Sequence, residues 1–144
     1  METVNKIGLD TNIFMGIFLG EKDKSEQSLS VLALIHEGVL EGVVSCISLI
    51  EIATLFYQRK EEQKAKKAVN LIKSLPNTTI VDVTSDTALL ISQIKVSEKL
   101  SIADATVLTA AIELSADAFL TFDEDFINIG CIPCMKPGDY IKLL

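Results

Sequence analysis

The most informative part of this sequence is a short stretch near its N-terminus, Lys6-Ile7-Gly8-Leu9-Asp10-Thr11-Asn12-Ile13-Phe14. An apolar run there ends in one carboxylate, and small polar residues follow it. Such a run is typical of a buried central strand in a parallel sheet. Open parallel sheets bind their ligands outside the carboxyl ends of their strands, which is where we expect Asp10 to lie. Because aspartate is also a common helix cap, its role depends on whether other acidic residues join it.

Short apolar runs alternate with helical patterns along the rest of the chain. We expect strands at residues 4–9, 41–46, 79–83 and 117–121, with a short edge strand at 131–135. Apolar periodicity and capping residues predict a short helix or turn at 11–19 and helices at 25–37, 48–74 (with a break near Lys60), 85–98 and 101–114. The charged residues 21–24 are expected to form a solvated turn before Ser25, which would cap its helix. This alternation predicts an α/β protein with a mostly parallel sheet of four or five strands.

Length and composition fit one folded domain over residues 1–144. The 144 residues are 49% hydrophobic and 23% charged, which provides enough apolar material for a core. The longest uncharged runs have about ten residues, well short of the roughly 20 needed to span a bilayer. The N-terminus has no basic segment followed by an apolar one, so we expect no signal peptide and a cytoplasmic location.

The charge of the chain is acidic but uneven. The net charge of −7 argues against a protein that binds nucleic acid over its whole surface. Residues 59–73, however, hold six basic residues against two acidic ones, a net +4, which leaves −11 for the rest of the chain. Two interpretations stay open, a solvated Lys-rich helix face or a contact surface for RNA phosphates, with these candidate residues: Arg59, Lys60, Lys64 and Lys67.

The cysteines and the one histidine give little support for a zinc or redox site. Three cysteines do not make a secreted disulfide framework. Cys131 and Cys134 form a lone CxxC, and a zinc site would need two further ligands that the sequence does not offer nearby. Small apolar residues in a loop and a late strand are the simpler interpretation. His36 is expected on the surface or half-buried on a helix, so we do not assign it as a base.

Three acidic residues besides Asp10 lie in apolar surroundings. Glu51 is the only charged residue between Glu41 and Arg59, on a helix that is apolar nearly all round and is therefore expected to be buried. Asp104 lies in a second apolar helix, although Ser101 and Asp104 also resemble a capping box. A charged carboxylate in either place is costly unless it is paired or binds a cation.

Asp123 follows the apolar run 118–122 and so repeats the arrangement of Asp10 at another strand end. Solvated loop acids are the alternative interpretation, because Glu124 and Asp125 follow it directly. Two strand-end acids and two helix acids can converge at one edge of a parallel sheet, where their like charges repel. Oxygen ligands without histidine or cysteine select Mg²⁺ or Mn²⁺ over zinc. The chemistry that suits such a cluster is metal-assisted hydrolysis of phosphodiesters.

These motifs together resemble the PIN-domain family, and in particular the VapC-like toxin subunit of VapBC-type toxin–antitoxin pairs. The matching elements occur in the family's order over the whole chain: Gly8-Leu9-Asp10-Thr11-Asn12-Ile13-Phe14, Ser48-Leu49-Ile50-Glu51-Ile52, Leu100-Ser101-Ile102-Ala103-Asp104-Ala105 and Leu120-Thr121-Phe122-Asp123-Glu124-Asp125-Phe126. The resemblance implies a three-layer α/β/α fold and a ribonuclease that depends on Mg²⁺ or Mn²⁺. It also implies a homodimer and a small antitoxin that inhibits the active site.

The resemblance assigns roles to individual residues. It makes Asp10, Glu51, Asp104 and Asp123 the catalytic and metal-binding quartet, with Asp10 and Asp104 as the first candidates for direct ligands. Glu51 would bind the metal directly or through water, or act as the base on the attacking water. Asp125 is the alternative to Asp123. Two polar residues are expected to orient the carboxylates: Asn12 and Thr121.

Two other functions remain open from the sequence. The acidic balance and the modest basic segment leave room for a non-catalytic module of the same fold that binds RNA or protein. A phosphatase with Asp10 as nucleophile is disfavoured, because it would want a second aspartate two residues on and position 12 is Asn. Binding of a divalent metal distinguishes the nuclease from the binding module.

Overall fold

The computed structural model of the chain describes residues 4–144 and has a five-stranded sheet in the order β3-β2-β1-β4-β5. All four neighbouring pairs are parallel. The predicted α/β class and parallel sheet are therefore confirmed. The strands are short, and they lie close to the predicted positions: β1 (Asn5–Leu9), β2 (Leu40–Ser45), β3 (Thr78–Val81), β4 (Ala118–Leu120) and β5 (Cys134–Met135).

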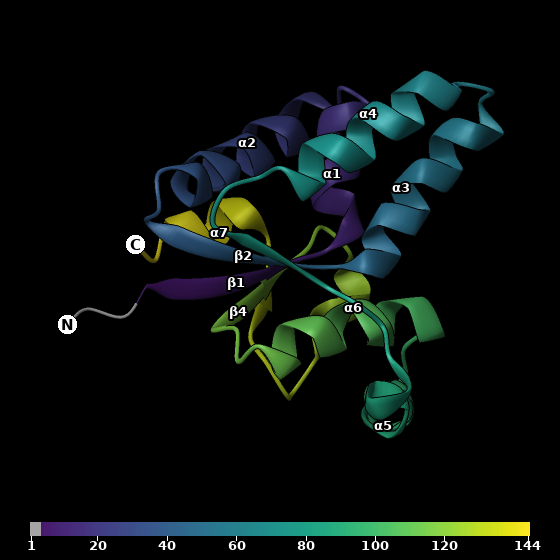
Figure 1. Cartoon of the computed structure of the whole chain (residues 1–144). Helices are drawn as coiled ribbons and strands as arrows, with labels where there is room; N and C mark the ends of the chain where they lie inside the picture. The colour runs from purple at the N-terminus through teal and green to yellow at the C-terminus, as the bar shows by residue number, and fades with distance from the viewer. Residues whose placement is uncertain (1–3) are drawn as a thin grey trace.

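Helices cover both faces of the sheet and complete the three-layer fold that the resemblance implied. Helices α1 to α4 and α7 lie on one face, and α5 and α6 lie on the other (Figure 1). No helix within residues 4–144 is long and apolar enough to cross a membrane. The helices are α1 (Thr11–Phe18), α2 (Lys22–His36), α3 (Cys46–Gln58), α4 (Glu62–Lys73), α5 (Ala88–Glu98), α6 (Ile102–Glu113) and α7 (Pro137–Ile141), with 3-10 turns η1 (Ser85–Thr87) and η2 (Glu124–Phe126).

Two helices begin two or three residues earlier than the sequence pattern predicts. The expected charged turn at residues 21–24 is wrong, because α2 already begins at Lys22. Lys and Glu are good helix formers, and Lys24 pairs with Glu21 at 3.1 Å. Helix α3 begins at Cys46 rather than Ser48, since Ser45 accepts a hydrogen bond from the backbone N–H of Ile47. Strand β2 therefore passes into α3 without a loop.

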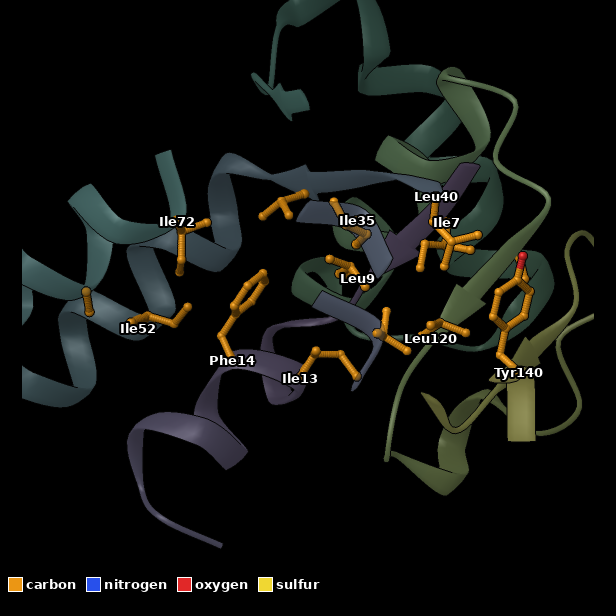
Figure 2. Close-up of a cluster of buried hydrophobic side chains, with 14 of the residues drawn as sticks. Ile7, Leu9, Ile13, Phe14, Ile35, Leu40, Ile52, Ile72, Leu120 and Tyr140 are labelled. Carbon is orange, nitrogen blue, oxygen red and sulfur yellow. The ribbon is translucent and has the colours of Figure 1, made fainter. Parts of the chain in front are cut away.

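The larger core lies between the sheet and the layer of α1 to α4 and α7. Side chains point to alternate faces of a strand, so Ile7 and Leu9 of β1 enter this core while Gly8 faces the other way. Figure 2 shows these strand residues together with side chains from the helices, among them Phe14, Ile52 and Ile72. This packing fixes the carboxyl end of β1, and with it the position of Asp10.

Gly8 allows α6 to lie close against β1 on the opposite face. A Cβ atom at this position would be 2.5 Å from Cβ of Ala111 and 2.9 Å from Cδ1 of Phe119. Both distances are shorter than real contacts, and Ala111 has no flexible side chain that could move aside. The glycine therefore sets how closely α6, which carries Asp104, approaches the strand that carries Asp10.

Gly8→Ala is expected to lower the free energy of unfolding by about 1–3 kcal/mol, because overpacking a filled core displaces backbone and side chains. Urea unfolding followed by circular dichroism measures the change. Gly130→Ala is the matched control, since the nearest atom to its Cβ is 3.8 Å away. Adding Ala111→Gly to Gly8→Ala should recover part of the loss, and additive losses would contradict this packing argument.

The strand order brings the ends of β1 and β4 together at the centre of the sheet. From β1 the chain moves outward to β2 and β3, then crosses to the other side for β4 and β5. Leu9 and Leu120 are paired residues, and the N–H of Asp10 donates to the carbonyl oxygen of Leu120 at 3.0 Å. In open parallel sheets, a reversal of strand order creates the crevice where ligands bind. Asp10 and Thr121 lie at this reversal.

Candidate active site

Asp10 is a buried carboxylate held by two hydrogen bonds. Only 6% of the residue is exposed. It caps α1, where its Oδ1 accepts from the backbone N–H of Thr11 at 2.8 Å. Its Oδ2 accepts from the hydroxyl of Thr121 at 2.7 Å. The helix-cap interpretation and the site interpretation are therefore compatible, because capping occupies only one of the two carboxylate oxygens.

Thr121 connects Asp10 to the loop that follows β4. Its hydroxyl oxygen accepts from Nδ2 of Asn12 at 3.2 Å and from the backbone N–H of Asp123 at 2.9 Å. The Oδ1 of Asn12 in turn accepts from the backbone N–H of Phe122 at 3.2 Å. Asn12 and Thr121 thus fix the geometry between the ends of β1 and β4. The role of both residues in orienting the metal-binding carboxylates stays a prediction.

Glu51 reaches the site through Thr11. The hydroxyl of Thr11 donates to Oε1 of Glu51 at 2.7 Å and lies 2.8 Å from the hydroxyl oxygen of Ser48. The expectation that Glu51 is buried was wrong, because the residue is exposed. Helix α3 buries only one face, through Ser48, Ile52 and Phe56.

The all-round apolar pattern of α3 misled the prediction because apolar residues also occupy its outer face. Ile50 is 59% exposed and Tyr57 is 52% exposed. Glu51 therefore lies at the open side of the site. Among residues 4–144, its second carboxylate oxygen, Oε2, has no hydrogen-bond or ion-pair partner.

Asp104 lies in the first turn of α6 and is half-buried. Ser101 caps this helix by accepting from the backbone N–H of Asp104 at 3.1 Å. The next seven residues, 105–111, are all buried. Helix capping therefore does not exclude a role for Asp104 in the carboxylate cluster, because the capping bond uses the backbone N–H of Asp104 and not its carboxylate.

Asp123 lies between the end of β4 and η2 and is also half-buried. Its Oδ1 accepts from the backbone N–H of Asp125 at 2.9 Å, so the aspartate caps the 3-10 turn. Asp125 itself is exposed. The charges of both aspartates reach Asp104 and raise the pKa of its carboxyl. Both candidates for the fourth acidic position therefore lie near Asp104.

The charges of these acids raise the pKa values of two members of the cluster, Asp10 and Asp104. The pKa of Asp10 is raised from 3.8 to about 7, mainly by burial; the hydrogen bonds from Thr121 and Thr11 lower it, and the charges of Asp104 and Glu51 make smaller contributions that raise it. Burial is also the main cause that raises the pKa of Asp104, followed by the charge of Asp123, with smaller effects from Glu51 and Asp125. None of these carboxylates forms an ion pair within the described chain. The cluster therefore favours a cation or protons.

The donor chemistry of the cluster fits a hard divalent cation. Carboxylate oxygens suit Mg²⁺ and Mn²⁺. No group of three Asp, Glu, His or Cys side chains in residues 4–144 is close enough to hold a metal ion by itself. Magnesium usually keeps several waters and takes only one or two carboxylates. The cluster thus fits such an ion if water or substrate oxygens complete its ligand shell.

The basic residues predicted to contact RNA lie apart from the carboxylates. Arg59, Lys64 and Lys67 line a cavity of about 340 Å³ at α3 and α4 that shares no residue with the acidic cluster. Lys60 follows in the turn between these helices, with a left-handed backbone (φ 58°). Lys64 is engaged by Glu61. These contacts leave the role in RNA binding as a prediction.

The cysteines and the histidine take the simple positions expected of them. Cys131 is exposed in a loop, and Cys134 begins β5. Burial, together with the charges of Cys131, Glu98 and Asp10, raises the pKa of Cys134 to about 12. A thiol with so high a pKa does not form the reactive thiolate. His36 is exposed at the last turn of α2.

Thr11 and Ser48 are site residues that the sequence prediction did not include. Together they link α1 to α3 and hold Oε1 of Glu51. Their positions contained the necessary information, because Thr11 directly follows Asp10 and Ser48 lies one helical turn before Glu51. Small hydroxyl residues are, however, too common at helix starts for this spacing alone to identify them.

Solved structures of toxin–antitoxin proteins share this fold. VapBC2 of Rickettsia felis, bound to a promoter DNA fragment, matches with a TM-score of 0.71 and 16% identity, over 90% of this chain and 96% of that chain. A toxin–antitoxin complex of Klebsiella pneumoniae matches with a TM-score of 0.67 and 21% identity, over 92% and 98% of the two chains. VapC20 of Mycobacterium tuberculosis, a toxin that cleaves the sarcin–ricin loop, matches with a TM-score of 0.67 and 20% identity, over 83% of this chain and 92% of that chain.

The sequence comparison places the chain in a family. No curated protein matches the sequence. Residues 7–130 match the PIN domain family, and this range contains Asp10, Glu51, Asp104 and Asp123. The match spans β1 to η2, and therefore the whole carboxylate cluster. This chain belongs to the PIN domain family.

Proposed function

We propose that this protein is an endoribonuclease that uses Mg²⁺ or Mn²⁺ and acts as the toxin of a toxin–antitoxin pair. One observation carries the proposal: where the strand order reverses, the charges of Glu51, Asp104 and Asp123 raise the pKa of Asp10 or of Asp104, and no basic side chain in residues 4–144 pairs with these carboxylates. Membership of the PIN domain family and the likeness to VapC folds support it.

In this proposal Asp10 and Asp104 hold the metal directly. Their raised pKa values support this choice, because a nearby divalent charge would stabilise the ionised form of both groups. Glu51 would hold the metal directly or through water, and Asp123 or its neighbour Asp125 would complete the acidic set. When bound, the metal would activate water and stabilise negative charge on the phosphoryl oxygens.

The protein's own residues position these groups. The backbone N–H of Thr11 and the hydroxyl of Thr121 each donate a hydrogen bond to one carboxylate oxygen of Asp10. Asn12 donates to the hydroxyl of Thr121 and accepts from the backbone N–H of Phe122, and so connects this carboxylate to the loop after β4. Glu51 is exposed and uses only Oε1 for the contact with Thr11, so its Oε2 is the atom to accept a proton from the attacking water. Arg59, Lys60, Lys64 and Lys67 are proposed to contact RNA phosphates farther along the strand.

The partners follow from the same proposal. VapBC2 of Rickettsia felis and the Klebsiella pneumoniae protein were solved as toxin–antitoxin assemblies, which supports a small antitoxin as the partner here. We also propose a homodimer, a cytoplasmic location and a single domain over residues 1–144. A small neighbouring gene that encodes a DNA-binding head and an amphipathic tail would support the antitoxin.

A non-catalytic module that binds RNA or protein is the second candidate function. It is favoured by the absence, within residues 4–144, of a three-ligand group that could hold a metal by itself. The proposal of catalysis is tested by incubating a mixed RNA pool with the protein in Mg²⁺ or Mn²⁺, with and without EDTA. Metal-dependent cleavage separates the two functions.

Mn²⁺ is expected to raise the melting temperature of the wild-type protein and not that of Asp10→Asn. A ligand at about a hundred times its Kd adds about 2.7 kcal/mol of stability, which corresponds to roughly 5–10 °C for a chain of this size. The measurement is a thermal melt with increasing MnCl₂, with NaCl at equal ionic strength as the control. Equal responses of the two proteins would show that Asp10 does not bind the metal.

A further inference from the structure

A cavity of about 230 Å³ opens beside the carboxylate cluster. It lies between the ends of β4 and β5, the turn η2 and the start of α7. Thr121 and Asp123 belong to both the cavity and the cluster, so the two are continuous. A phosphodiester held at the carboxylates would therefore have its neighbouring nucleotide next to this cavity. The volume is below the roughly 300 Å³ at which pockets for drug-sized ligands begin, so the cavity suits one ring system.

The wall of the cavity is apolar. Phe126 is fully buried and packs against Phe119 with 5.1 Å between ring centroids, which makes this part rigid. Met135 of β5 is half-buried beside it. Ile127, in contrast, is 67% exposed although it is a large apolar residue. An exposed apolar side chain next to a rigid apolar wall provides a surface for the flat face of a base, whereas a phosphate would gain nothing from it.

The rim of the same cavity is polar. Glu124 and Asp139 are exposed, and neither carboxylate has a hydrogen-bond or ion-pair partner in the described part of the chain. Ionised carboxylates only accept hydrogen bonds. Lys136, at the start of α7, adds a cation to this lining. The rim therefore recognises a group that donates hydrogen bonds from its edge, and the nearby lysine reduces its repulsion of an anionic strand.

We propose that this cavity receives one unpaired nucleobase next to the cleaved phosphodiester, and that Asp139 and Glu124 select a base with an exocyclic amino group over uracil. Proteins recognise single-stranded RNA by stacking on base faces and by hydrogen bonds to base edges. Cytosine, adenine and guanine each present an exocyclic amino donor that a carboxylate can accept, whereas uracil has a carbonyl oxygen in place of the amino group of cytosine. This inference rests on the proposed ribonuclease function.

The first test compares RNA oligonucleotides that differ only at the base beside the cut. Wild-type protein in Mn²⁺ is expected to cut at cytosine or adenine about tenfold faster than at uracil, the order of one good contact to a base edge. Asp139→Asn replaces one acceptor oxygen with a donor and should reduce that ratio severalfold. Asp86→Asn, an exposed aspartate in η1, is the control that should keep it. Equal rates at all bases, or an unchanged ratio in Asp139→Asn, would overturn the subsite.

A second test measures binding without cleavage, so that it separates the subsite from the ribonuclease function. Cytidine and uridine monophosphate are titrated in EDTA while methyl resonances are followed by NMR. We expect cytidine monophosphate to shift Ile127 and Met135 at lower concentration than uridine monophosphate, with Leu89, exposed on α5, as the control. Shifts with no RNA cleavage would contradict the proposed function and keep the subsite. Cleavage with no shift at Ile127 and Met135 would contradict the subsite and keep the proposed ribonuclease function.

Discussion

Asp104→Asn is expected to lower RNA cleavage by about a hundredfold or more and to leave the protein folded. The substitution removes a carboxylate whose pKa is raised by burial and by the charges of Asp123 and Glu51. A loss of that size is typical when one preorganised electrostatic group at a reacting centre is removed. The helix cap survives, because Ser101 accepts from the backbone N–H of residue 104 and not from its side chain. Initial rates on a short RNA in Mn²⁺ measure the effect.

The control for this variant lies on the same helix. Glu113→Gln changes an exposed acid at the last residue of α6 and should keep the wild-type rate. Urea unfolding of both variants separates catalysis from folding, since the raised pKa of Asp104 means that its charge does not stabilise the fold. Cleavage that survives Asp104→Asn, or that persists in EDTA, would refute the metal-dependent mechanism.

The sequence predicts the sheet and the position of Asp10 at a strand end better than it predicts the exposure of the acids. The sequence places Asp10 correctly at the end of β1, because a buried parallel strand appears as a continuous apolar run. The run ends at Asp10, which caps the next helix. Glu51 is misjudged because helix periodicity shows only that apolar residues surround it. Whether Ile50 and Tyr57 face a core or solvent depends on which helices pack against α3, and this tertiary information is not local.

The hydrogen-bond network shows the same limit. Thr121 contacts Asp10 across a separation of 111 residues, and Thr11 contacts Glu51 across 40. Such contacts depend on the strand order β2-β1-β4, which a single sequence does not specify. Gly8 is a second example, since its need for close packing appears only once α6 is placed against β1. The resemblance pointed to Asn12 and Thr121, but local pattern alone identified neither of them, nor Thr11 and Ser48.

In EDTA, the stability of the wild-type protein is expected to fall as the pH rises from about 4 to 7, and Asp10→Asn should remove much of this fall. The pKa of Asp10 is raised from 3.8 to about 7 in the folded protein, mainly by burial. Between these values the folded state holds a proton that the unfolded state has lost, so stability decreases with rising pH. The full difference corresponds to about 4 kcal/mol, a large share of the 5–15 kcal/mol typical of a folded protein.

The comparison of variants isolates Asp10 from the other acids. Urea unfolding is measured at pH 4, 5, 6, 7 and 8. The free energy of unfolding of Asp10→Asn should increase relative to that of the wild type up to about pH 7, and the difference between the two proteins should then stay constant. Thr121→Val removes a hydrogen bond that lowers the pKa of Asp10. The stability of this variant should therefore keep falling with rising pH beyond the pH at which that of the wild type levels off. A constant difference between wild type and Asp10→Asn at every pH would mean that Asp10 is ionised throughout. Its burial would then require a partner that residues 4–144 do not supply.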